Sequence, residues 1–314
     1  HGEHLTHSRC YTTSRDTANN QAKARLSNPD DTPPALPKSP KPMSDQTPGT
    51  APFTEVWIEH PEGRLFSRVW TPAQSAGRPL PDAPIIMLHD SLGSVELWRD
   101  FPAALSLATG RQVVAYDRLG FGRSSPRQGA LPLDFIAAEA RHDFTLVRRQ
   151  LGIGRFIAFG HSVGGGMAVN CAAEFADDCE ALITIAAQAF PEDRTLDGIR
   201  VAKAQFQDVR QVERLEKYHG DKARWVLDAW TETWLSPAFA DWSLAPVLPR
   251  VRCPLLAIHG LHDEYGSTRH PELIGQLNHS SRAQVEIMAD SRHMPHREHP
   301  EAVIERVRAF LAGG

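Results

Sequence analysis

The stretch from residue 160 to 165 constrains the fold of this chain more than any other feature. It reads Gly-His-Ser-Val-Gly-Gly, follows the apolar run Phe156–Phe159 and precedes the helix-compatible Met167–Val169. This order predicts a strand, a tight turn and a helix, with Ser162 at the apex of the turn. A Gly-x-Ser-x-Gly string occurs by chance in many chains. Its position between a strand and a helix makes it a specific signal.

Two glycines make so sharp a turn possible. Gly160 and Gly164 lie two residues before and after Ser162, where only very small residues let the strand and the helix approach each other closely. The turn strains the serine backbone and lifts its hydroxyl clear of the sheet. It also directs the N–H of Val163 toward whatever the hydroxyl attacks.

Composition limits the classes of partner. The chain has 314 residues, of which 41% are hydrophobic and 23% charged, with a formal net charge of -4. These values are ordinary for a globular protein and give no electrostatic reason to expect nucleic acid or an anionic membrane as partner. We therefore expect a small-molecule ligand. The sequence does not indicate an oligomeric state.

The sequence also bears on location. No apolar run of about 18 residues is present to form a membrane-spanning helix, and the first 50 residues lack the apolar segment of a secretory signal. The four cysteines are too sparse for a disulfide framework. We expect unreactive thiols and a cytoplasmic protein.

Residues 1–50 differ from the rest of the chain. They are polar and carry seven prolines between Pro29 and Pro48, so they cannot bury enough apolar surface to offset their ordering entropy. We predict a disordered extension. Because Met43 is the first methionine, residues 1–42 are expected to be an upstream extension, which mass spectrometry of the native N-terminus would test. A set of potential metal ligands recurs every three residues: His1, His4, His7 and Cys10. We favour a flexible tail over a metal site for this segment.

The remaining chain divides into a core and an insertion. Residues 51–190 and 251–314 begin with a predicted hairpin, Thr54–Ile58 and Leu65–Trp70, and continue as alternating buried strands and helices. That alternation predicts an α/β fold with a mostly parallel sheet covered by helices on both faces. In residues 191–250 the alternation stops and four of the seven tryptophans gather, so we predict a helical cap over the carboxyl ends of the strands.

Three of the core helices are predicted with specific bounds. One runs from about Leu97 to Leu107 and is ended by Gly110. A second, over residues 136–151, has apolar residues at the 3.6-residue period. The last is led by Pro300.

A serine nucleophile needs a base, which in turn needs an orienting carboxylate. The acid candidate is Asp263, where a loop leaves a buried strand, and the base candidate is His293, just past the next strand. The order of Ser162, Asp263 and His293 matches the chain order expected for α/β-hydrolases. Alternatives stay open for both partners: Glu264, Asp193 and Asp197 for the acid, and His296 and His299 for the base. His161 is predicted to be a packed residue.

With these residues placed, the chain from about residue 54 to 311 resembles an α/β-hydrolase fold protein of the esterase-like kind with a helical cap. Besides the turn at Ser162, four segments carry the resemblance: residues 88–94 (LHDSLGS), 116–124 (YDRLGFGRS), 260–263 (GLHD) and 293–300 (HMPHREHP). The resemblance implies an oxyanion hole formed by the N–H groups of Ser91 and Val163. It also implies that no cofactor and no metal take part.

One residue departs from the family pattern. Asp90 stands where the family has glycine after the oxyanion-loop histidine. A carboxylate there opposes the stabilisation of negative charge, so we expect Asp90 to point away or to be neutralised by Arg118 or a histidine. In the cap, Trp230 and Trp234 lie one helical turn apart. They are predicted to pack against the main domain or to line a substrate pocket.

The resemblance implies a serine hydrolase that cleaves a small, largely apolar carboxylic ester through an acyl-enzyme intermediate. A serine at position 162 argues against dehalogenases and epoxide hydrolases of this fold, which use aspartate. Carbon-carbon bond hydrolases, thioesterases, lactonases, aminopeptidases and perhydrolases remain alternatives, as does a hydrolase-like protein that binds a small ligand without catalysis.

Overall fold

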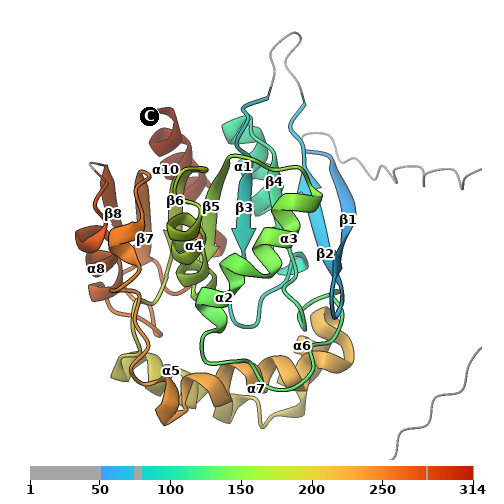
Figure 1. Ribbon diagram of the computed structural model, residues 1–314. Coiled ribbons are helices and arrows are strands. Elements are labelled where there is room, and N and C mark those ends of the chain that lie inside the picture. The colour runs from blue at the N-terminus through green and yellow to red at the C-terminus, as the bar shows by residue number, and fades with distance from the viewer. Residues whose placement is uncertain (1–50, 74–79, 281, 314) are drawn as a thin grey trace, which may run out of the picture. The chain divides into compact units, whose positions relative to one another are not determined.

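An eight-stranded sheet forms the centre of the computed structural model, which describes residues 51–73, 80–280 and 282–313 (Figure 1). The strands lie in the order β1-β2-β4-β3-β5-β6-β7-β8. Their bounds are β1 Phe53–His60, β2 Gly63–Trp70, β3 Ile85–Leu88, β4 Val113–Tyr116, β5 Phe156–His161, β6 Cys179–Ile185, β7 Leu255–Gly260 and β8 Ala283–Met288. The predicted extension of residues 1–50, with the histidines and Cys10 considered as metal ligands, lies outside the described residues.

The sheet is antiparallel at one edge and parallel elsewhere. β1 and β2 form the predicted entry hairpin, with Ile58 opposite Leu65, and β2 pairs antiparallel with β4. All other strand pairs are parallel. The carboxyl ends of the parallel strands therefore lie side by side along one end of the sheet, where ligands bind in open α/β folds.

Helices cover both faces of the sheet, as predicted. In β3, Ile85 and Met87 face one core cluster, whereas Ile86 and Leu88 face the other, because successive side chains of a strand point to opposite faces. The first face is covered by α1 (Phe101–Thr109) and α10 (Pro300–Ala312). The second face is covered by the helices α2 (Phe135–Arg141), α3 (Asp143–Gln150), α4 (Val163–Glu174) and α8 (Arg269–Leu277).

The single helix predicted over residues 136–151 is wrong, because the structure divides it into α2 and α3. The chain breaks at His142, with φ -109° and ψ -99°. Next to the break, Asp143 accepts a hydrogen bond from the Leu119 N–H at 2.9 Å, and the Thr145 hydroxyl donates to the Ala140 carbonyl at 2.8 Å. The second contact occupies the Ala140 carbonyl oxygen, which in a continuous helix would accept a backbone N–H four residues later.

The helix predicted over residues 97–107 is also divided. A short 3-10 helix, Glu96–Trp98, is separated from α1 by Arg99, whose φ is +53°. Gly110 ends α1 in the left-handed conformation, as predicted. The last predicted helix, led by Pro300, is present as α10.

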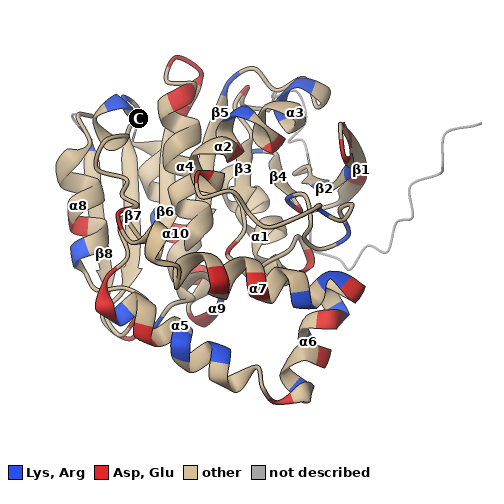
Figure 2. Ribbon diagram, turned by 60° about the horizontal axis from the view of Figure 1, so that its bottom comes forward, with Lys and Arg blue, Asp and Glu red and all other residues tan. Residues whose placement is uncertain are grey.

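The segment predicted as a cap is helical in the structure. It contains α5 (Asp193–Gln205), α6 (Val209–His219) and α7 (Ala223–Trp234), joined and followed by the 3-10 helices Gly220–Lys222, Pro237–Phe239 and Leu248–Arg250. Figure 1 shows α5, α6 and α7 below the edge of the sheet toward which β3 points. Both acidic and basic residues lie along these helices in Figure 2. The boundaries of a separate cap remain a prediction.

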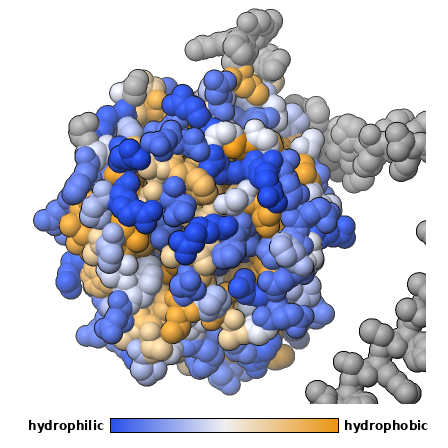
Figure 3. All heavy atoms as spheres, in the orientation of Figure 1, coloured by the Kyte–Doolittle hydropathy of each residue, from blue (hydrophilic) through white to orange (hydrophobic). Residues whose placement is uncertain are grey.

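The surface and the thiols give little further indication of function. The face shown in Figure 3 is mainly hydrophilic, with apolar residues in small groups. Among the residues that the structure describes, no helix combines the length and the apolarity needed to span a bilayer. Cys171, Cys179 and Cys253 are buried free thiols.

Candidate active site

Ser162 stands in a strained turn between β5 and α4. Its φ is +55° and its ψ -124°, a backbone region that costs a non-glycine residue about 1–3 kcal/mol. A Cβ on Gly160 would lie 2.0 Å from the Gly164 carbonyl oxygen, and one on Gly164 would lie 2.2 Å from the Leu88 carbonyl oxygen. Both glycines are therefore required by close approach, as the sequence predicts. The Ser162 side chain lines a cavity.

Asp263 and His293 are joined at the carboxyl ends of β7 and β8. His293 Nδ1 lies 2.9 Å from both carboxylate oxygens of Asp263, which can only accept, so Nδ1 carries the proton. The Asp263 side chain is fully buried and accepts a further hydrogen bond from the Tyr265 N–H at 2.7 Å. This pairing leaves His293 Nε2 as the ring nitrogen available to a substrate or a nucleophile.

The two residues shift each other's pKa in opposite directions. Burial alone would lower the pKa of His293, but the charge of Asp263 and its hydrogen bond raise it more, so it lies above its ordinary value. Burial would raise the pKa of Asp263, yet attraction and hydrogen bonding by His293 leave it below its ordinary value. The pair therefore favours an ionised aspartate beside a histidine that accepts protons readily.

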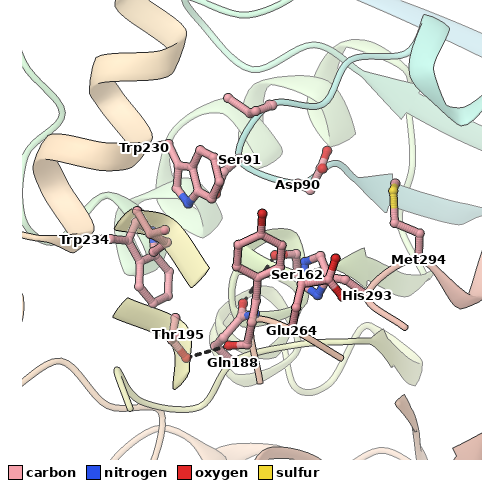
Figure 4. A pocket seen from close by; sticks show the side chains of 13 residues that line it. Asp90, Ser91, Ser162, Gln188, Thr195, Trp230, Trp234, Glu264, His293 and Met294 are labelled. Atoms are coloured by element: carbon pink, nitrogen blue, oxygen red, sulfur yellow. Dashed lines mark hydrogen bonds between the residues drawn. The ribbon is translucent and has the colours of Figure 1, made fainter. Parts of the chain in front are cut away.

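The Ser162 hydroxyl donates to Gln188 Oε1 at 3.3 Å. In the described part of the chain no hydrogen bond joins Ser162 to His293, although both line one cavity (Figure 4). Sequence reasoning missed Gln188, which follows β6 and is only 3% exposed. Its place just beyond a parallel strand is the one signal that could have identified it.

The cavity has a volume of about 230 Å³ and is mostly apolar on the side of α5 and α7. Trp230 and Trp234 both line it, and both also pack: Trp230 edge-on against Tyr265, and Trp234 against Phe239. Both tryptophans therefore pack against neighbouring side chains and line the cavity, and their contact with a substrate stays a prediction. The remaining lining residues are Asp90, Ser91, Leu92, Ser162, Gln188, Thr195, Ile199, Glu264, Tyr265, His293 and Met294.

The two backbone N–H groups predicted for the oxyanion hole are available. Ser91 lines the cavity, and Val163 begins α4 directly after Ser162. Neither N–H donates to another group within residues 51–73, 80–280 and 282–313. Asp90 also lines the cavity. Arg118 contacts its carbonyl oxygen, and His161 Nδ1 lies 4.0 Å from its carboxylate.

The alternative histidines have other positions in the structure. His296 is buried against Trp98, and His299 donates from Nε2 to the Asp290 carbonyl oxygen. His161 is 1% exposed and donates from Nε2 to the His293 carbonyl oxygen at 2.9 Å, so it packs behind the turn, as predicted.

The alternative acids are likewise not paired with His293. Glu264 is exposed and lines the cavity, Asp193 begins α5, and Asp197 pairs with Arg200. Within the described residues, no group of three His, Cys, Asp or Glu side chains is arranged to hold a metal.

Comparison with known families agrees with this architecture. A family model described as alpha/beta hydrolase fold matches residues 83–300. The chain belongs to the α/β-hydrolase fold family. The match covers more than half of the chain and includes the loops that carry Ser91, Ser162, Asp263 and His293, and it confirms the predicted family and fold. As a member of this family, the protein is a hydrolase.

Curated relatives are similar over different shares of their length. The human serine hydrolase BPHL is 27% identical over 223 residues, which cover 68% of this chain and 74% of that protein. A (lyso)-N-acylphosphatidylethanolamine lipase from Bos taurus is 34% identical over 128 residues, 40% of this chain. This chain therefore matches only 36% of the length of the cattle lipase, and the match does not show that lipase's activity for this chain.

Solved structures share the fold. A membrane phospholipase A described as a bacterial virulence factor aligns with a TM-score of 0.66 at 21% identity, covering 83% of this chain and 86% of that one. The enol-lactonase from Burkholderia xenovorans LB400 aligns with a TM-score of 0.60 at 20% identity, covering 82% of this chain and all of that one. At these identities the likeness shows the α/β-hydrolase fold alone.

Proposed function

We propose that this hydrolase cleaves a small, largely apolar carboxylic ester through an acyl-enzyme intermediate. The observation that carries the proposal is the strained placement of the Ser162 hydroxyl in a cavity that His293 also lines, with His293 oriented by the buried Asp263. A non-glycine residue that close-packed glycines hold in such a conformation is typical of a nucleophile. The strained backbone is retained because it presents the hydroxyl to the substrate.

In the proposed reaction, the Ser162 hydroxyl turns from Gln188 to His293 Nε2 and attacks the ester carbonyl carbon. His293 accepts the proton and then donates it to the oxygen of the leaving alcohol. Water then attacks the acyl-Ser162 carbonyl carbon while His293 accepts its proton, and His293 returns this proton to Ser162 Oγ as the acyl–oxygen bond breaks and the acid is released. The N–H groups of Ser91 and Val163 bind the oxyanion in both halves, each contributing about 2.7–4 kcal/mol.

The cavity supports a small substrate. Its volume of about 230 Å³ and its apolar side near Ile199, Trp230 and Trp234 suit a short acyl or aromatic group. We further propose that Trp230 and Trp234 form walls of the substrate pocket and that the protein is cytoplasmic. No cofactor enters any step.

Labelling with a fluorophosphonate tests the nucleophile. We expect the wild-type protein to be labelled at Ser162 and to hydrolyse p-nitrophenyl butyrate with a burst of nitrophenol. Ser162→Ala should abolish both. Ser236→Ala, which removes only a local cap of a 3-10 helix, should leave both unchanged. Wild-type turnover by Ser162→Ala would end this mechanism, and a folded wild-type protein that is never labelled would favour the non-catalytic, ligand-binding alternative.

A second candidate, an aminopeptidase-like activity, is favoured by the charge of the cavity. Two carboxylates, Asp90 and Glu264, line it, whereas no lysine or arginine is among its described lining residues. Such a field favours a substrate with a protonated amine, further stabilised over an aromatic face. A panel of amino-acid p-nitroanilides, neutral p-nitrophenyl esters, thioesters and lactones separates the candidates. A higher kcat/KM for the amino-acid substrates would replace the neutral ester as the proposed substrate.

A further inference from the structure

Arg118 holds the loop that carries Asp90 and Ser91. Its side chain is 4% exposed, and its guanidinium Nη2 donates to the Asp90 carbonyl oxygen at 3.0 Å. Its backbone N–H donates to His89 Nε2 at 3.2 Å. His89 Nδ1 in turn donates to the same Asp90 carbonyl at 2.8 Å, since a carbonyl oxygen can only accept. One arginine thus fixes this carbonyl both directly and through the His89 ring.

Within the described residues Arg118 has no direct ion pair, although the carboxylates of Glu139 and Asp143 act on it from further away: burial lowers the pKa of Arg118, and these charges offset that effect only in part. No ion pair within 4.0 Å engages it among the residues the structure describes, and its Nε has no hydrogen-bond partner there. Its guanidinium carbon lies 4.1 Å from the centre of the Phe121 ring. A buried guanidinium is costly unless it is paired. The distant carboxylates and the Phe121 ring offset only part of the desolvation cost of Arg118, and its guanidinium hydrogen bond goes to a neutral peptide, which points to a use of that peptide.

The peptide in question joins Asp90 to Ser91. Because a trans peptide is planar, its C=O and N–H point in opposite directions, so fixing the Asp90 carbonyl fixes the direction of the Ser91 N–H. The Gly93 N–H donates to the same oxygen at 3.2 Å. The positively charged guanidinium that donates to this oxygen also polarises the peptide and strengthens its N–H as a donor.

We propose that Arg118 is a positioning residue of the oxyanion hole, which orients and polarises the Asp90–Ser91 peptide so that its N–H stabilises the oxyanion. The inference rests on the proposed function, since it assigns a role within the same reaction. It also changes the expectation for Asp90: Arg118 acts on the backbone of Asp90, and its positive charge offsets the nearby carboxylate without pairing with it.

The test compares Arg118→Met with Arg123→Met. Methionine keeps the length and the apolar stem of the side chain but removes charge and donors. Arg123 belongs to the same turn, is 42% exposed at its side chain and pairs with Glu55, so its replacement controls for loss of a nearby arginine. Steady-state kinetics with p-nitrophenyl butyrate, active-site titration, binding of a boronic acid that adds to Ser162, and thermal unfolding are measured for both.

We expect Arg118→Met to lower kcat per titrated site about 10- to 100-fold, less than the 10²- to 10³-fold typical of losing a whole donor, because His89 and Gly93 still hold the carbonyl. KM should change less than about twofold, and affinity for the boronic acid should fall by the same factor as kcat/KM. Arg123→Met should keep all three values.

A kcat of Arg118→Met within about twofold of wild type, or a loss of kcat without a matching loss of boronic-acid affinity, would overturn the role of Arg118 while leaving the serine mechanism intact. A wild-type protein that is not labelled by fluorophosphonate would instead overturn the proposed function itself. If Arg118→Met does not fold, the same measurements are made on Arg118→Lys. Lysine keeps the positive charge but lacks the planar guanidinium, so kcat should fall at least about threefold.

Discussion

The two sides of the cavity are built in different ways. On the side of the sheet, Ser162, Asp263 and His293 stand on loops that leave β5, β7 and β8, and their orientation is fixed by hydrogen bonds and by glycine contacts. On the side of α5 and α7, Trp230 and Trp234 are held by aromatic contacts. Directional bonds fix atoms to within tenths of an ångström, whereas apolar contacts tolerate repacking. Chemistry is therefore expected from the first side and substrate choice from the second.

Removing the carboxylate should give the largest effect on the sheet side. Asp263→Asn is expected to lower kcat about 10⁴-fold, because an amide cannot hold His293 in the Nδ1-protonated tautomer or stabilise its positive charge. Steady-state kinetics measure this loss. Asp197→Asn, at an exposed aspartate that pairs with Arg200 and does not line the cavity, is the matched control and should keep kcat within about twofold. Equal losses in the two variants would contradict the assignment of Asp263.

On the helical side, Trp234→Ala should act first on stability. The side chain is 3% exposed and packs edge-on against Phe239 and Trp242, so its loss should reduce the free energy of unfolding by about 3–5 kcal/mol. Urea denaturation measures this change. A stable Trp234→Ala protein with a large loss of kcat would break the division between the two sides.

Trp230→Ala should have the smallest effect and sharpen the comparison. This tryptophan is half-buried and contacts Tyr265, so its loss should enlarge the cavity more than it destabilises the fold. We expect KM for short acyl esters to rise about tenfold while kcat stays within about threefold, since apolar pocket contacts typically contribute 1–3 kcal/mol. An acyl-length series on p-nitrophenyl esters measures the change. An unchanged chain-length preference would remove Trp230 from the pocket wall.

The difference between the two sides also explains how far the sequence could lead. The turn at Ser162 is a local pattern: its glycines, its strand and its helix all lie between Phe156 and Glu174, so a short stretch of sequence predicts the geometry. The central strands were predictable for the same reason, since β3, β4 and β7 are short, buried, mainly apolar runs.

What escaped prediction depends on contacts between distant segments. The helix break at His142 accompanies a hydrogen bond from Leu119 to Asp143, and Gln188 reaches Ser162 from the end of a different strand. The contact of Arg118 with the carbonyl of Asp90, instead of its carboxylate, is likewise set by packing. The sequence carries no local signal for the helix break or for the contact of Arg118, and for Gln188 the one signal is its place just after a strand.

The rate of acylation as a function of pH tests the central claim most directly. The burst of nitrophenol on mixing the protein with p-nitrophenyl butyrate reports attack by Ser162, which requires a neutral His293. Since Asp263 raises the pKa of His293, the burst rate should be low in acid and rise with a midpoint above about 6.5, the ordinary histidine value. A burst rate that stays flat between about pH 5 and about pH 8, or no burst at all, would contradict the account.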